Sequence, residues 1–244
     1  MINVAADLSR FYGLLARLEH LPNQGLPLRQ LASKQALPNR GVYFFREPGE
    51  IFETDGATRI VRVGNNAVSA GSKSTLHSRL KTHRGSQSGS GNHRGSIFRL
   101  HVGNALLAKE NHQIPTWGSG STAPQELRTS VAAQLAEALW EKRVSEVIGA
   151  MTVLWVDIPD EPNSANQRAT VEQNSIALLS NHRSPIAPAS EQWLGRFSPR
   201  EEIRASRLWN VKYIDKSYDQ AFLDILEQAV DRTCFSFRDL KPEP

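Results

Sequence analysis

The spacing of apolar and polar positions predicts short strands that alternate with amphipathic helices. Two apolar runs, 41–45 and 58–64, are rich in aromatic and β-branched residues, and turn residues separate them. We expect these runs to form an antiparallel pair, since antiparallel strands need no crossover helix between them. A further alternating run at 151–158 predicts a third strand.

Apolar residues also recur at helical spacing in the segments around these runs. The expected helices cover 4–20, 74–83, 96–109, 126–147, 166–180 and 217–230, with shorter ones at 28–34 and 200–207. No change in composition marks a linker, so residues 1–244 are expected to form a single domain. The pattern predicts an α/β protein of the α+β kind, in which helices flank a small antiparallel sheet.

The overall composition is ordinary for a globular chain, with 244 residues, 39% hydrophobic and 22% charged. No run approaches ~18 apolar residues, and the first residues lack the pattern of a signal peptide, so we expect no membrane span. Cys234 is the single cysteine, which excludes an internal disulfide and fits a reducing compartment. We therefore expect a cytoplasmic protein.

Positive charge is concentrated in one part of the chain. Residues 56–109 contain no Asp or Glu but nine Lys or Arg and four His, so the remaining residues carry +4 − 9 = −5. Such a distribution is typical of a surface that meets phosphates, although a solvated basic face is the simpler alternative. The side chains that we expect to contact backbone phosphates are Lys73, Lys81, Arg84, His93, Arg94 and Arg99.

The helix expected at 74–83 carries two polar residues on a semi-buried face. Arg79 and His83 lie one turn apart, and Leu76 and Leu80 share their side of the helix. Polar groups in such a position need partners. Either a bound phosphate or a structural ion pair provides them.

In the helix expected at 166–180, a glutamate interrupts an apolar stripe. Glu172 lies among Ala169, Ile176 and Leu179 when the residues are placed on a helix. A carboxylate in that position is unfavourable unless it is paired or bound to a cation. Two interpretations stay open, a salt bridge to the basic segment and a ligand for a hard metal ion such as Mg²⁺.

The order of these residues resembles the GIY-YIG nuclease superfamily. The matching features are Gly-Val-Tyr at 41–43, Arg-Val-Gly at 62–64, Arg-x3-His at 79–83, then Glu172 and Asn181. The resemblance implies a three-stranded antiparallel sheet flanked by helices, a divalent metal ion (Mg²⁺ or Mn²⁺) and cleavage of DNA. It places the core at about 40–83 and 150–182, with a basic insertion at about 84–150 and a helical extension at 183–244.

The resemblance also assigns roles to individual residues. Tyr43 matches the tyrosine of the first motif, Arg79 the arginine of the first helix, and His83 the position one turn later. Glu172 matches the metal-binding glutamate and Asn181 the asparagine after it. As implied roles, Glu172 holds the metal, Arg79 stabilises charge on the phosphate, Tyr43 or His83 activates the attacking water, and Asn181 supports the metal site.

Arg62 departs from the pattern, because the second motif usually has tyrosine at this position. Either Arg62 positions a phosphate or the attacking water, or it marks a degenerate module that binds nucleic acid without cutting it. The main hypothesis is a metal-dependent DNA endonuclease, with restriction or defence as one role and a homodimer if both strands are cut. RNA cleavage is a weaker alternative.

Overall fold

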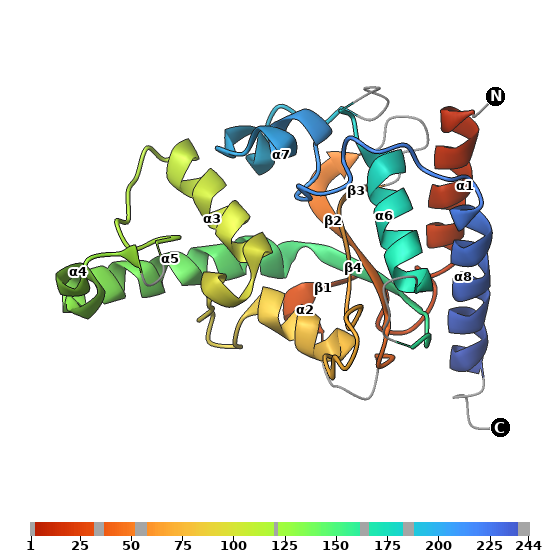
Figure 1. Ribbon diagram of the computed structural model, residues 1–244, viewed down its shortest axis with the longest axis horizontal. Helices are drawn as coiled ribbons and strands as arrows, with labels where there is room; N and C mark the ends of the chain where they lie inside the picture. Colours follow the sequence, from red (N-terminus) through yellow and green to blue (C-terminus); the bar gives the residue numbers. More distant parts are fainter. Residues whose placement is uncertain are drawn as a thin grey trace.

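The computed structural model describes residues 3–31, 37–51, 58–119, 122–161, 166–182 and 188–238, which form one antiparallel sheet with helices on both faces (Figure 1). The strands are β1 (Leu26–Pro27), β2 (Gly41–Ile51), β3 (Thr58–Asn65) and β4 (Thr152–Asp157), in the order β1-β4-β2-β3. The three predicted strands are present, but the expectation of a three-stranded sheet was wrong. The fourth strand, β1, has two residues, too few to show an alternating pattern.

The pairing of β2 with β3 determines which side chains share a face of the sheet. Tyr43 lies opposite Gly64, and Phe45 lies opposite Arg62. Because side chains alternate along a strand, these four positions project to the same side. The first motif and the second motif of the sequence are therefore neighbours on one surface.

The eight α-helices of the described chain agree with most of the predicted segments. They are α1 (Val4–Ala16), α2 (Leu76–Arg84), α3 (Ile97–Lys109), α4 (Gln125–Thr129), α5 (Val131–Ala150), α6 (Gln167–Leu179), α7 (Glu201–Ser206) and α8 (Phe222–Arg238). The chain also forms 3-10 turns η1 (Leu28–Gln30), η3 (His93–Gly95) and η5 (Leu194–Phe197). No helix in this part of the chain is long and apolar enough to cross a membrane.

Two helix predictions need correction. The single helix expected at 126–147 is divided at Ser130, whose backbone is extended and whose side chain caps α5 at the Ala133 amide. Of the helix expected at 28–34, only η1 is observed, and 32–36 lies outside the described residues.

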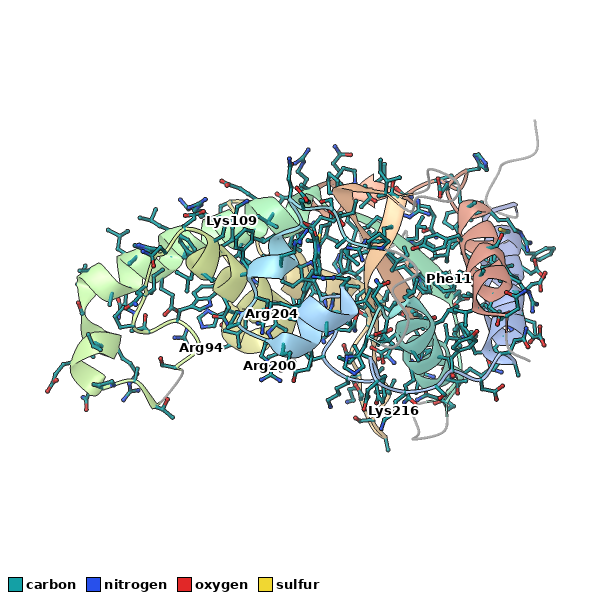
Figure 2. The ribbon with its side chains drawn as sticks, turned by 90° about the horizontal axis from the view of Figure 1, so that it is seen from above. Phe11, Arg94, Lys109, Arg200, Arg204 and Lys216 are labelled. Atoms are coloured by element: carbon teal, nitrogen blue, oxygen red, sulfur yellow. The ribbon has the colours of Figure 1, made fainter. Side chains whose placement is uncertain are left out.

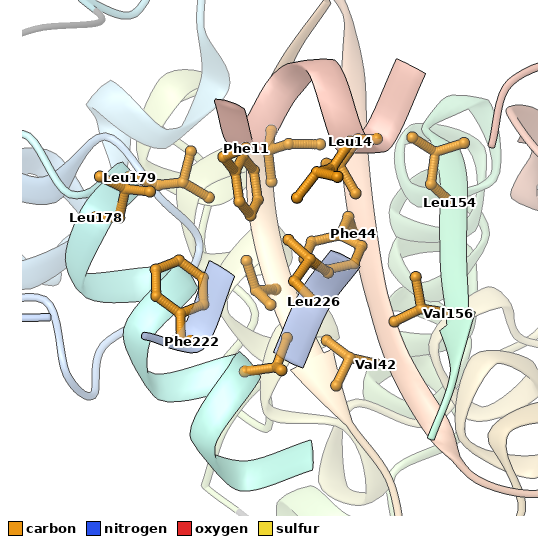
Figure 3. Close-up of a cluster of buried hydrophobic side chains, with 14 of the residues drawn as sticks. Phe11, Leu14, Val42, Phe44, Leu154, Val156, Leu178, Leu179, Phe222 and Leu226 are labelled. Carbon is orange, nitrogen blue, oxygen red and sulfur yellow. The ribbon is translucent and has the colours of Figure 1, made fainter. Parts of the chain in front are cut away.

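A separate hydrophobic core fills each face of the sheet. Helices α1, α6 and α8 cover one face (Figure 1), where Phe11, Phe44 and Leu226 meet (Figure 3). Helices α2, α3 and α5 cover the other face, where Phe45 and Phe98 are buried. Tyr43 belongs to this second core, so the tyrosine of the first motif points toward α2.

The first half of α5 extends away from these cores together with α4 (Figure 1). The apolar stripe predicted there is exposed, with Val131 79%, Leu135 58% and Leu139 54% accessible. The helix instead buries Trp140 and Val144 further along.

A loop after α7 covers the outer edge of β3. The Trp209 amide donates to the Val61 carbonyl at 2.7 Å. The Asn210 side chain accepts from the Val63 amide at 3.0 Å and donates to the Val63 carbonyl at 2.9 Å. Unpaired strand edges are open to association with other chains, so this loop both satisfies β3 and protects it.

The Asn210 side chain is expected to be important for stability. Asn210→Ala leaves the buried amide and carbonyl of Val63 without partners, and we expect the free energy of unfolding to fall by about 2 kcal/mol. Urea denaturation measures this change. Asn104→Ala is a matched control, because no hydrogen bond of the Asn104 side chain occurs in the described chain. Equal stability of the two variants would contradict the role given to Asn210.

Candidate active site

Three buried side chains, those of Tyr43, His83 and Ser96, form a hydrogen-bonded row that joins β2, α2 and the start of α3. The Tyr43 hydroxyl lies 2.8 Å from Nε2 of His83. Nδ1 of the same ring lies 2.8 Å from the hydroxyl of Ser96. All three side chains are buried, with Tyr43 and His83 fully inaccessible. Ser96 also caps α3, since its oxygen accepts from the Arg99 amide at 3.3 Å.

His83 is held in its neutral form. Burial lowers the pKa of His83 well below its ordinary value, and the positive charges of Arg62, Arg79 and Arg99 lower it further. A neutral imidazole has one N–H donor and one acceptor. If Ser96 donates to Nδ1, then Nε2 carries the proton and donates to the oxygen of Tyr43.

The glycines of both motifs are required by close contacts with the neighbouring strands. A Cβ atom on Gly64 would lie 2.2 Å from the Tyr43 hydroxyl oxygen. On Gly41, a Cβ atom would lie 2.2 Å from the Val156 carbonyl oxygen. Glycine lacks this atom, so the chain can approach closely at both positions. The phenol of Tyr43 therefore lies directly over the backbone of β3.

Arg62 is an ordered, buried cation on the same face as Tyr43. It donates to the Trp209 carbonyl at 3.0 Å, and its guanidinium lies 4.6 Å from the centre of the Phe98 ring. Its Nε atom is buried without a hydrogen-bond partner in the described chain. The geometry distinguishes Arg62 from a solvated strand residue.

Glu172 projects from α6 to the end of β3. Its Oε2 atom accepts a hydrogen bond from the Asn65 amide at 2.7 Å. Burial raises the pKa of Glu172 to about 7, although the positive charges of Arg62, Arg79 and Lys212 oppose the increase. This carboxyl group is poised between its protonated and ionised forms near neutral pH.

Arg62 and Arg79 connect the two halves of the site. Their charges act on the pKa of His83 and also on that of Glu172. Arg79 is half-buried, and no hydrogen bond or ion pair of its side chain occurs within the described residues. Arg62 and Arg79 thus act electrostatically both on His83, which contacts Tyr43, and on Glu172.

Asn181 lies just beyond the end of α6 and joins that helix to α7. Its backbone amide donates to the Ser206 carbonyl at 3.0 Å, and its side-chain amide approaches the same oxygen at 3.5 Å. This contact fixes the direction in which the chain leaves α6. A supporting role for Asn181 in metal binding stays a prediction.

The six residues expected to contact phosphates occupy different environments. Lys73 and Lys81 are exposed, and no acidic partner of either occurs in the described chain. Arg84 is half-buried and donates to the Leu31 carbonyl at 2.8 Å. Figure 2 shows Arg94, which forms an ion pair with Glu137.

His93 and Arg99 instead form a buried network with Glu141 of α5. The Glu141 carboxylate accepts from His93 Nδ1 at 2.9 Å and from Arg99 Nε at 2.9 Å. Arg99 also donates to the His83 carbonyl at 2.9 Å. Burial would raise the pKa of Glu141, but the His93 hydrogen bond and the Arg99 charge bring it below the ordinary value. The network holds α5 against the helix that carries His83.

Three contributors to the site were missed by the sequence interpretation. Ser96 had a visible signal, because a serine directly before a helical segment is a typical cap. Asn65 follows the second motif, but nothing in its type indicates a partner 107 positions away. Lys212 lies in a loop without a recognisable motif.

The single carboxyl group of the site, that of Glu172, suits a metal held mainly by oxygen ligands from outside the protein. Within the described chain, no three His, Cys, Asp or Glu side chains are grouped to hold an ion. Glu172 uses one oxygen for Asn65, and its Oε1 atom makes no hydrogen bond to the described residues. Mg²⁺ is commonly bound by one or two carboxylates with water and substrate phosphates, so the residues present fit this ion.

Comparison with known proteins gave one match. A family model described as the GIY-YIG domain matches residues 2–235, which include both motifs, α6 and the loop after α7. Neither a curated protein nor a solved structure shows significant similarity to the chain.

Gly64→Ala tests the close approach of Tyr43 to β3. The added methyl group would displace the phenol or distort the sheet, and we expect the free energy of unfolding to fall by about 2 kcal/mol or more. Chemical denaturation measures the effect. Gly13→Ala in α1 is the control, because no atom lies within 4 Å of its added Cβ. A Gly64→Ala protein as stable as wild type would contradict this packing.

Proposed function

The chain belongs to the GIY-YIG family of nucleases, and we propose that it is a divalent-metal-dependent endonuclease that hydrolyses phosphodiester bonds in DNA. The observation that carries the proposal is the convergence of the Tyr43–His83 pair and Glu172 on Arg62 and Arg79. A nucleophile-activating group, a carboxylate and two cations are the parts required to cut a phosphodiester.

The proposed metal ligand is Glu172, with Mg²⁺ or Mn²⁺ as the ion. The ion supplies Lewis acidity at the phosphate when it is bound. Asn65 orients the carboxylate through Oε2, as outer partners of metal ligands commonly do. Asn181 contributes by fixing the end of α6, the helix that carries Glu172.

Tyr43 is the proposed general base, and His83 positions and stabilises it; because the Tyr43 side chain is fully buried, this role requires that its hydroxyl become accessible to the attacking water when the substrate binds. With Ser96 donating to Nδ1, His83 donates from Nε2 to the oxygen of Tyr43. Once Tyr43 has lost its proton, the Ser96 hydroxyl and the His83 N–H, which are the remaining donors among these three side chains, both have an acceptor. In the opposite direction, Tyr43 donates to Nε2 and the buried Ser96 proton has no acceptor in the described chain. While Tyr43 keeps its proton, either direction leaves one buried proton of the row without an acceptor, and every proton is hydrogen-bonded only when Tyr43 has lost its proton and Ser96 donates to Nδ1.

Arg79 and Arg62 stabilise the charge that develops on the phosphate. Arg79 has no protein partner among the described residues, so its donors are available to a substrate oxygen. Arg62 is held by the Trp209 carbonyl and the Phe98 ring, and a fixed cation needs little reorganisation during the reaction. This fixed position supports activity over a degenerate, binding-only module.

Contacts with the DNA backbone outside the centre are proposed for the exposed Lys73 and Lys81, with Arg84 beside them in α2. His93, Arg94 and Arg99 contribute by ordering the segment around α3, because each of them already contacts an acidic side chain. A restriction or defence role, a cytoplasmic location and a homodimer for double-strand cuts are extensions of the same proposal.

A plasmid-nicking assay with and without Mg²⁺ tests the proposal. Glu172→Gln keeps an acceptor for Asn65 but removes the charge, and we expect cleavage to fall roughly 10³-fold. DNA binding without metal should persist. Glu146→Gln, an exposed position on α5, is the matched control and should cut as wild type does.

The binding-only alternative makes the opposite prediction. In that case wild type and Glu172→Gln would be equally inert with plasmid while both bind DNA. If the protein cleaves an RNA competitor in preference to DNA, then RNA is the substrate.

The titration of Glu172 predicts a pH dependence. Its folded pKa of about 7 lies above the ordinary 4.5, so the ionised form that binds metal is lost as pH falls through 7. We expect cleavage to rise with pH across this range, and Glu172→Asp to move the midpoint. Burial and the nearby arginines lower the pKa of His83 well below its ordinary value, so its titration is not expected to add a step near neutral pH. A profile that is flat from pH 6 to 8 would contradict the assignment.

The same pKa has a consequence for stability. A raised folded pKa favours folding below pH 4.5, and this contribution is lost as pH rises through about 7. Glu172→Gln should therefore melt at a higher temperature than wild type at pH 8 without metal, and the difference should shrink at pH 5.

A further inference from the structure

The loop after α7 brings a lysine to the site described above. The Trp209 amide is bonded to Val61, and the next residue, Asn210, is bonded to Val63. The residue number increases along both chains from the first contact to the second, so this part of the loop runs in the same direction as β3. We name residues 208–213 the edge strap. Two residues further along each chain, the strap reaches Lys212 and the strand reaches Asn65.

The other end of the edge strap is attached to α6. The Tyr213 hydroxyl accepts a hydrogen bond from Gln173 at 3.4 Å, and Gln173 directly follows Glu172. Tyr213 has a φ of 65°, in the left-handed region, so the chain turns sharply just after Lys212. Lys212 is thus held where the end of β3 meets α6, which is also where Asn65 binds Glu172.

The Lys212 side chain is exposed, and no hydrogen bond or ion pair of its ammonium group occurs in the described chain. Its charge, with those of Arg62 and Arg79, acts on Glu172. Three cations thus act on a single carboxyl group, so positive charge exceeds negative charge in this part of the protein. A phosphate oxygen is the natural partner for such an excess.

We propose that Lys212 binds a phosphate of the DNA substrate beside Glu172, which makes the edge strap a structural part of the cleavage site. The inference rests on the proposed function, because it assigns a further substrate-binding residue to the same centre. It also gives a role to a segment that lies outside the core expected from the sequence motifs.

The test measures binding and cleavage separately. Fluorescence anisotropy with a labelled duplex in EDTA gives the dissociation constant over a range of salt concentrations. For Lys212→Gln we expect the slope of log affinity against log salt to fall by about one, as for the loss of one phosphate contact. Single-turnover cleavage with Mg²⁺ should slow about 10- to 100-fold, and Lys212→Arg should recover most of both properties.

Lys216→Gln is the matched control. Lys216 is also exposed in the same loop (Figure 2), but it lies 3.8 Å from Asp215 and outside the edge strap. The control should keep the wild-type slope and rate. Since Lys212 is exposed, its substitution should leave the melting temperature unchanged, and equal melting curves confirm that folding is intact.

The outcomes separate this inference from the proposed function. If wild type cuts DNA and Lys212→Gln matches it in rate and salt slope, the Lys212 assignment is overturned and the nuclease stands. If wild type binds DNA without cutting it, the nuclease is overturned and the salt slope still decides the role of Lys212. A wild-type protein that neither binds nor cuts overturns both.

Discussion

The hydrogen bond between Tyr43 and His83 is the constraint around which this face of the protein is built. Both groups are fully buried, so each must find its partner inside the protein. That requirement fixes the neighbours in turn. β3 must bring a glycine under the phenol at Gly64, and α3 must begin where Ser96 can reach the far side of the imidazole. A strand pair, a helix and a helix cap are thus coupled by one polar contact, and a change at any of them moves the tyrosine.

The arginine in the second motif changes the electrostatics of this arrangement. A tyrosine at position 62 would have supplied a neutral hydroxyl, whereas Arg62 supplies a permanent charge that acts on both His83 and Glu172. The charge lowers the pKa of both groups. For His83 it reinforces burial, so the imidazole stays neutral. For Glu172 it opposes burial, so the carboxyl group can ionise near neutral pH. Arg62 therefore favours both a neutral imidazole beside Tyr43 and an ionised Glu172, which are the states that the proposed hydrolysis uses.

The local spacing of apolar and polar residues was sufficient to predict most strands and helices from the sequence. Strands β2 and β3 followed from their apolar runs, and the helix that carries Arg79 and His83 followed from its helical repeat. What could not be predicted are contacts made by groups distant in the sequence. Asn65 meets Glu172 across 107 positions, and the carbonyl that holds Arg62 belongs to Trp209, 147 positions away. No periodicity encodes such pairs, because they depend on how α6 and the edge strap pack on the finished sheet. The short strand β1 and the division of α4 from α5 were missed because two residues, or one extended residue, carry too little signal.

The acid-free segment at 56–109 has a more specific meaning in three dimensions than its composition suggested. Three of its arginines form ion pairs with glutamates from other elements: Arg59 with Glu50, Arg94 with Glu137, and Arg99 with Glu141. These pairs attach the segment to β2 and α5, and they remove three of the nine cations from any role as free phosphate contacts. Of the six remaining cations, Arg62 and Arg79 act on both His83 and Glu172 of the candidate site, Lys73, Lys81 and Lys109 are exposed, and Arg84 is half-buried. The positive charge left for a substrate is therefore divided between Arg62 and Arg79, which act on His83 and Glu172, and cations that lie outside this group.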